Sequence, residues 1–384
     1  MNSLLNSIYG NVKDTTSILT DIDIQIEATS AINKMYNYQF EEAEKEFRWL
    51  SSEYKNHPLP VFLLGLSSWW KIDAQSSKSY IGESQKENVL DKNFLNLMDE
   101  SINLSKRIYN QGNKVDGAFF LAASYGFKGR LLSERRKWSA AAFAGRNAIK
   151  YLKEIRKDDL MIPEISFGNG LFNYYSVWIS ERYPLLKPII KLFPEGNKNK
   201  GVEQLNIASN NSFYTRTEAQ YFLMRIYSGE GKLTKALQLS KYLKDTYPEN
   251  SIFHKYFTQL LYRNSRLNEC LKESNNIIIN YDKRKFGYNE DEARIAHFFL
   301  GEIYHSNLNF DKAIFNYKKS IEFSEKIGKQ KMGYSIFSNF SLGRISFNRN
   351  EYKQAKIYFK RVLKLTKRKD DLNKRSRNFL KKIK

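Results

Sequence analysis

Small residues recur at a regular spacing in the C-terminal part of the chain, and this recurrence constrains the fold more than any other feature. Each small residue opens the second helix of a predicted pair. The first helix of that pair carries a large residue, which in two cases belongs to a Leu-Gly pair such as Leu300-Gly301. Aromatic residues such as Tyr304 and Tyr317 lie one helical turn from the small positions. The small residues follow one another at steps of 34, 43 and 42: Ala236, Cys270, Ala313 and Ala355.

The spacing has a physical cause. Two helices approach closely where one of them carries glycine or alanine, and each pair leaves an apolar face that a neighbouring pair must bury. Aromatic side chains fill the space between successive pairs. The pattern is typical of tetratricopeptide repeats (TPR). We therefore predict an all-α fold, a TPR-like right-handed α-solenoid of about eight helical hairpins.

The N-terminal half follows the same pattern less regularly. We predict a lead segment over 1–25, a degenerate TPR-like region with long inserts over 26–215, regular repeats over 216–366 and a basic tail over 367–384. Long connections in a compact array are usually functional or disordered. Three are expected here: Ile72 to Asp91, Gly126 to Lys137, and Ser180 to Lys200.

One stretch of the degenerate region carries more than a general repeat pattern. A glycine-rich helix is followed by a proline-containing link, a turn and a second glycine-starting helix. The residues concerned are Phe167, Gly168, Gly170, Leu171, Phe172 and Asn173, and then Gly196, Gly201 and Leu205. Together they resemble the signature of the tetratricopeptide-39 family, the family of inclusion-body clearance proteins. The resemblance covers residues 26 to 250.

Some positions depart from that family or narrow the resemblance. Asn197-Lys198 replaces the Asp-Arg pair of the family's turn, so a role for that pair does not carry over. Trp69-Trp70 and Asn173-Tyr174-Tyr175 are most similar to bacterial relatives of Bacteroidetes type. The resemblance implies a helical adaptor without catalysis.

The residues that usually carry chemistry are few. The four histidines form no pair of metal ligands on one helix, and Glu302 with His305 occurs once where a di-iron bundle needs the motif twice. Cys270 occupies a small packing position, which indicates an inert buried thiol. No phosphate-binding loop is present. We predict no catalytic residue, no metal, no cofactor and no small-molecule substrate.

The first helix of each TPR pair is expected on the concave side of the array. Aromatic and arginine side chains there suit a peptide with apolar and acidic residues, because such side chains dominate binding hot spots. The alternative is that the aromatic residues pack inside the array. We predict a protein or peptide partner in this groove, lined by Tyr221, Arg225, Phe298, Glu302, His305, Phe340, Arg344 and Phe347, with Glu218, Ser228 and Phe337 at equivalent positions.

The charge of the chain favours an alternative partner. From Glu351 to Lys384 there are 14 Lys/Arg against three Asp/Glu, which gives half of the total net charge of +22. The apolar stretch from Tyr183 to Phe193 is expected to fold back over the array as a cap, or else to dock a partner or enter a membrane interface. In the latter case this stretch and the basic tail would suit a peripheral protein on an anionic membrane or envelope surface. Nucleic-acid binding is disfavoured, because no recognition module is present. A cytoplasmic location is expected, or a periplasmic or envelope location if the true start lies upstream.

Overall fold

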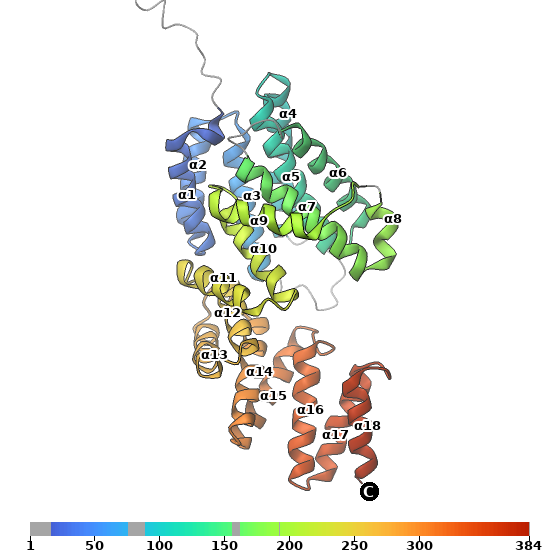
Figure 1. Cartoon of the computed structure of the whole chain (residues 1–384). Helices are drawn as coiled ribbons and strands as arrows, with labels where there is room; N and C mark the ends of the chain where they lie inside the picture. Colours follow the sequence, from blue (N-terminus) through green and yellow to red (C-terminus); the bar gives the residue numbers. More distant parts are fainter. Residues whose placement is uncertain (1–16, 76–88, 156–161, 192, 384) are drawn as a thin grey trace, which may run out of the picture. The chain divides into compact units, whose positions relative to one another are not determined.

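The computed structural model describes residues 17–75, 89–155, 162–191 and 193–383, and the regular structure in this part of the chain is entirely helical. Successive helices form hairpins (Figure 1). The hairpins are α1 (Ile22–Tyr36) with α2 (Phe40–Glu53), α3 (Pro58–Gln75) with α4 (Val89–Asn110), α5 (Lys114–Glu134) with α6 (Trp138–Glu154), α7 (Ile162–Arg182) with α9 (Lys198–Asn211), α10 (Arg216–Gly229) with α11 (Leu233–Thr246), α12 (Ser251–Arg263) with α13 (Leu267–Asp282), α14 (Glu290–Ser306) with α15 (Phe310–Lys326), and α16 (Gly333–Asn348) with α17 (Tyr352–Leu365).

Four further elements complete the described part of the chain. They are the short helices η1 (Ile18–Thr20), η4 (Pro184–Leu186) and α8 (Lys187–Ile190), and the C-terminal helix α18 (Asp371–Lys382). The eight pairs confirm the prediction of a TPR-like α-solenoid built from helical hairpins. No helix among the described residues combines the length and the apolar character needed to cross a bilayer.

The chain divides into two compact units. The first unit takes its residues from Met1–Met35, Gln39–Ser68 and Val89–Phe222, and the second from Tyr36–Tyr38, Trp69–Asn88 and Leu223–Lys384. The first unit therefore holds most of α1 to α9, and the second holds α11 to α18.

The turn inside a hairpin has the same geometry in both units. One residue of the turn has a positive φ, and the backbone N–H after it bonds to the carbonyl five residues earlier, for example Asn309 N to Tyr304 O at 2.9 Å. This is the Schellman end of a helix. Glycine is favoured at the positive-φ position, but only Gly231 is a glycine. The full set is Tyr38, Arg136, Gly231, Ser265, Leu308 and Asn350.

In the second unit, small residues face aromatic rings at the helix crossings. Ala236, Cys270, Ala313 and Ala355 are fully buried, as their spacing predicts. A Cβ atom on Gly301 would come within 2.6 Å of the Tyr317 ring. The ring therefore occupies the space that the missing side chain leaves, which is the packing predicted from the repeat.

In the first unit, two glycines meet at the crossing of α7 and α9. A Cβ atom on Gly201 would lie 2.7 Å from the backbone N of Tyr174 and 2.8 Å from the carbonyl O of Gly170. The glycine-rich signature thus brings two helix backbones into direct contact. Asn197 caps α9 by accepting a bond from Lys200 N at 3.0 Å, a role that asparagine and aspartate perform equally well.

A buried carboxylate anchors the start of the first unit. Asp116 is fully buried on α5 and accepts bonds from Ser17 Oγ, from Ile18 N at 3.1 Å and from Asn113 Nδ2 at 3.0 Å. His57 Nε2 lies 3.3 Å from its Oδ2. Burial opposes ionisation of Asp116, but the hydrogen bonds outweigh burial and hold the pKa of the carboxyl below its usual value. The bond from His57 contributes most to this lowering of the pKa. The Asp116 carboxylate therefore ties η1 to α5 by hydrogen bonds from mainly neutral donors.

The second unit contains an ionic cluster around Asp291 at the start of α14. Its carboxylate pairs with Arg294 Nε at 2.6 Å, Lys329 Nζ at 2.9 Å and Lys255 Nζ at 3.5 Å. Lys255 also pairs with Glu292 at 2.6 Å. Burial opposes ionisation of Asp291, but the neighbouring cations outweigh it and hold the pKa of the carboxyl well below its usual value. Three cations around two carboxylates connect α12, α14 and the loop before α16.

The structure gives a different outcome for each of the three predicted long connections. The connection predicted from Gly126 to Lys137 is wrong, because α5 continues to Glu134 and the turn is only Arg135 to Lys137. Gly129 lies inside that helix, and a Cβ atom on it would lie 3.4 Å from the Ala141 carbonyl O, so it serves close packing and not a helix end. The predicted connection from Ile72 to Asp91 lies partly outside the described residues, whereas Ser180 to Lys200 does join α7 to α9 through η4 and α8.

The basic C-terminal segment contains a packed helix. The Phe379 ring of α18 stacks on the Phe359 ring of α17, with centroids 4.8 Å apart and planes at 8°. It also contacts Phe340 and Phe347 of α16. Residues 371–382 thus cover the end of the last hairpin, with the Arg375 guanidinium 4.8 Å from the Phe340 ring centroid and Lys374, Lys381 and Lys382 exposed.

Candidate functional site

The predicted groove residues lie on the first helices of their hairpins, but three of the aromatic ones are buried. Tyr221, Phe298 and Phe340 are 3%, 6% and 3% exposed. The Phe298 ring lies 4.9 Å from that of Tyr334, which comes from the next hairpin. Phe340 is covered by Phe379. The prediction that these three side chains line a groove is corrected, because they are buried inside the units. The next element along the chain supplies the ring that covers Phe298 and Phe340, and Tyr221 packs beside Phe222 of its own helix.

Glu302 is at the centre of a hydroxyl cluster in the second unit. Its carboxylate accepts bonds from Tyr317 at 2.5 Å, Tyr262 at 3.1 Å and Ser341 at 3.4 Å. These donors come from α15, α12 and α16. His305 Nδ1 lies 3.2 Å from the Tyr317 hydroxyl, and burial lowers the pKa of its imidazole. Glu302 therefore links neighbouring repeats, whereas His305 makes its contacts within its own hairpin, and the Glu302 carboxylate already has three donors.

The cations beside this cluster point outward. Arg344, one turn after Ser341 on α16, is exposed, and its charge contributes to the lowered pKa of His305. Arg263, next to Tyr262 on α12, is exposed and donates to Ser228 Oγ. Phe337 on α16 is 48% exposed. We call Arg263, Arg344 and Phe337, together with the half-buried Arg225 and Phe347, the first-helix face.

No group of three His, Cys, Asp or Glu side chains in the described ranges is arranged to hold a metal ion. Cys270 is fully buried, and burial raises the pKa of its thiol to about 12, as expected for the inert packing residue that the sequence predicts. The absence of enzymatic activity stays a prediction.

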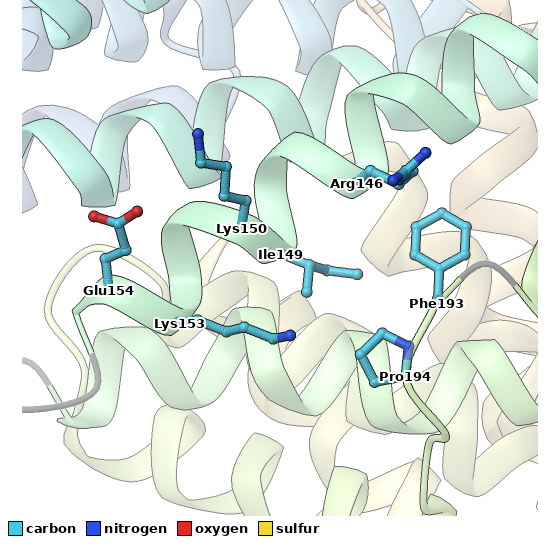
Figure 2. A pocket seen from close by; sticks show the side chains of 7 residues that line it. All are labelled: Arg146, Ile149, Lys150, Lys153, Glu154, Phe193 and Pro194. Atoms are coloured by element: carbon cyan, nitrogen blue, oxygen red, sulfur yellow. The ribbon is translucent and has the colours of Figure 1, made fainter.

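A pocket of about 420 Å³ lies in the first unit between α6 and the end of the connection to α9. Its lining residues are Arg146, Ile149, Lys150, Lys153, Glu154, Phe193 and Pro194. Figure 2 shows Arg146, Ile149 and Lys153 directed towards Phe193 and Pro194, whereas Lys150 points away from that wall. The sequence alone did not indicate this pocket, because Phe193 is far from α6 along the chain.

The wall of the pocket is fixed by packing. The Phe193 ring lies 6.4 Å from that of Phe172 on α7, and a Cβ atom on Gly145 would lie 3.6 Å from it. The connection thus folds back onto α6 and α7 at this end. At its other end Leu185 is 93% exposed and Tyr183 is 51% exposed. The predicted apolar segment from Tyr183 to Phe193 is therefore part packed and part exposed.

The fold is that of a helical-repeat protein of the TPR type. Human IFIT1, solved as a dimer with m7Gppp-AAAA, is similar in structure at a TM-score of 0.43 and 14% identity, over 100% of this chain and 84% of that one. Yeast Tom70 is similar at a TM-score of 0.29 and 13% identity, over 93% of this chain and 95% of that one. No family model matches the sequence, and no curated protein matches it.

Proposed function

We propose that this chain is a non-catalytic scaffold that binds an acidic peptide segment of a protein partner on the first-helix face of its second unit. The observation that carries the proposal is the contrast around Glu302. The Glu302 carboxylate is engaged by three hydroxyl groups, whereas Arg263 and Arg344 on the neighbouring helices α12 and α16 are exposed. Arg263 and Arg344 therefore present exposed guanidinium groups beside a carboxylate that already has donors.

The side chains on this face suit an acidic peptide with apolar residues. Guanidinium groups bind carboxylates through paired hydrogen bonds, which are stronger than neutral ones. Phe337 offers an exposed ring on the same helix as Arg344, two turns earlier. A bound segment would place carboxylates on the arginines and an apolar side chain on the ring.

A binding assay with defined peptides tests the proposal. The probe is a labelled twelve-residue peptide of alternating Glu and Leu, and its binding is measured by fluorescence anisotropy. A peptide with Lys in place of each Glu serves as the oppositely charged comparison. Changing Arg263 and Arg344 together to Glu is expected to weaken binding by about a hundredfold, since each charged bond contributes about 1.5–3 kcal/mol before screening.

The control must match the change in charge, because the net charge of +22 attracts any acidic peptide. Lys353 and Lys360 are exposed on α17, the second helix of its hairpin. Changing both to Glu removes the same charge away from the face and is expected to change affinity less than threefold. Equal losses in the two double variants would show non-specific attraction and refute the site.

A peripheral membrane role is the second candidate, and the exposure of Leu185 favours it. Leu185 and Tyr183 project from the connection beside the cations Arg182, Lys187 and Lys191, all of them exposed. Apolar side chains flanked by cations suit the boundary between headgroups and acyl chains. Flotation with anionic vesicles tests it: a Leu185→Asp variant and a chain truncated at Glu351 should bind less, and unchanged flotation of both would exclude this role.

Other expectations from the sequence remain proposals. The tetratricopeptide-39 resemblance would make the chain an adaptor, which agrees with a scaffold function. The cytoplasmic location and the bacterial origin stay predictions, and binding on the first-helix face depends on neither. The nucleic-acid partner that the sequence disfavours becomes a direct question for the anisotropy assay, with RNA as a third probe.

A further inference from the structure

The pocket on α6 has a distribution of charge that the scaffold function does not use. Arg146, Lys150 and Lys153 follow one another at steps of four and three residues, so they are neighbours on one face of the helix. Like charges at this spacing destabilise a helix. Among the described residues no ion pair is recorded for any of the three. Glu154 is the only acid in the lining. Its carboxylate accepts a hydrogen bond from the Tyr109 hydroxyl, and this bond raises the pKa of Tyr109 to about 12.

The position of the cations near a helix end explains only one of them. Cations in the last turn of a helix are stabilised by its dipole, by about 0.3–1 kcal/mol. Lys153 is in the last turn of α6. Arg146 lies two turns before the end, where the effect of the dipole has fallen off. The cluster therefore requires a further explanation.

The other side of the pocket is apolar and held in place. Phe193 is packed against Phe172 and lies beside Gly145, so its ring is fixed before any ligand arrives. Ile149 lies between Arg146 and Lys153 and is directed towards the same wall (Figure 2). A ligand in the pocket would meet two cations at its ends and an aliphatic and an aromatic surface along its length.

We propose that this pocket binds a phosphate-bearing ligand, with the phosphate between Arg146 and Lys153 and an apolar or ring portion against Phe193 and Ile149. A phosphate carries enough negative charge to offset neighbouring cations and accepts bonds from several donors at once. The pocket volume of about 420 Å³ accommodates a small phosphate ester. Such a phosphate comes either from a soluble compound or from a phospholipid headgroup.

Calorimetric titration of the full chain with inorganic phosphate and with phenyl phosphate tests the site. Phenyl phosphate is expected to bind about five- to tenfold more tightly than inorganic phosphate, because its ring meets Phe193. A Phe193→Ala variant should lose that preference and keep the binding of inorganic phosphate. Arg146→Glu combined with Lys153→Glu should weaken both ligands by at least tenfold.

A matched variant controls for general charge. Lys106 and Arg107 are exposed on α4 of the same unit and do not line the pocket, so Lys106→Glu combined with Arg107→Glu makes the same change in charge and should leave both affinities unchanged. Circular dichroism of each variant would establish that it is folded. Equal effects of this double variant and the Arg146→Glu, Lys153→Glu variant would overturn the proposal.

A second arm identifies the source of the phosphate. Vesicles containing phosphatidic acid are compared with vesicles of phosphatidylcholine alone in a flotation assay. Flotation that depends on phosphatidic acid and on Arg146 and Lys153 supports a headgroup, and binding of phenyl phosphate without such flotation supports a soluble ligand. Absence of binding in both arms contradicts the site. The peptide assay with Arg263 and Arg344 is independent, so failure of the phosphate site leaves the scaffold proposal standing.

Discussion

The first and second units bring their helices together by different means. In the first unit, Gly170 and Gly201 place two helix backbones in contact, and the link between those helices is long. In the second unit, Gly301 and Gly343 face the rings of Tyr317 and Phe359, and the links inside the hairpins are short. A crossing of backbone on backbone leaves less room for adjustment than a crossing against a side chain that can repack. The proposed peptide-binding face lies in the second unit.

The buried carboxylates should differ most between the units. Asp291→Asn removes the carboxylate that pairs with Arg294, Lys329 and Lys255, of which Lys255 keeps Glu292, and a broken buried pair costs about 3–5 kcal/mol. Asp116→Asn removes hydrogen bonds from mainly neutral donors and should cost about 1–3 kcal/mol. Hydrogen exchange followed by mass spectrometry would assign the loss to each unit. Equal costs would show that the ionic cluster is no more than a hydrogen-bond anchor.

Acid should weaken both units and the second unit more, because the pKa of Asp291 lies further below its usual value than that of Asp116. The folded-state pKa of Asp291 is below its unfolded value of about 3.9, so its contribution is present above that pH and is lost as the pH falls through the folded-state pKa. Unfolding by urea at pH 6, 4 and 3 should therefore show the second unit weakening below pH ~4. The Asp291→Asn variant should show a flatter pH dependence, and an unchanged slope would mean that the acid sensitivity does not arise from the ionic cluster.

Alanine substitutions at two glycines of the first unit should differ in their effect on stability, according to whether the glycine faces backbone or a flexible side chain. In Gly201→Ala the new Cβ meets backbone atoms at 2.7 and 2.8 Å, and we expect a loss of about 1–3 kcal/mol. In Gly65→Ala the Cβ meets the terminal methyl of Met98, a flexible side chain that can move aside. The gain in helix propensity then leaves a change within about 0.5 kcal/mol of zero. Urea titration measures both, and a larger loss for Gly65→Ala would reverse the interpretation.

The smallest predicted change in stability comes from substitutions at the turns. It should have the same sign in both units, because their turns share one geometry. Leu308 and Arg136 have φ values of 59° and 58°, where glycine is favoured. Leu308→Gly and Arg136→Gly should each stabilise the chain by about 0.5–1 kcal/mol, and Gly231→Ala should destabilise it by a similar amount. Thermal unfolding would register these shifts. Opposite signs for Leu308→Gly and Arg136→Gly would show that the turns differ.

Sequence reasoning reaches the fold because its main signal is local. Ala236, Cys270, Ala313 and Ala355 are buried as predicted, since a helix crossing requires a small residue wherever it occurs. The prediction of a connection from Gly126 to Lys137 fails, because a glycine used for close packing resembles a glycine that ends a helix. The two uses differ only in what lies opposite, and a single sequence does not contain that information.

The candidate sites are harder to predict. The repeat pattern places Phe298 on the first-helix side, but it does not show that Tyr334 of the next hairpin covers its ring. The pocket on α6 needs Phe193, which the chain brings back across a long link. The spacing of Arg146, Lys150 and Lys153 is visible in the sequence and could have marked that helix face as a cationic surface.

Hydrogen exchange with the acidic peptide bound tests the central claim most directly. If the peptide lies on the first-helix face, amides in α12 and α16 should exchange more slowly in the complex, and α5 to α7 of the first unit should be unchanged. This protection should disappear in the Arg263→Glu, Arg344→Glu variant and persist in the Lys353→Glu, Lys360→Glu variant. Protection confined to α6 or to α17 and α18, or unaffected by the arginine changes, would contradict binding on this face.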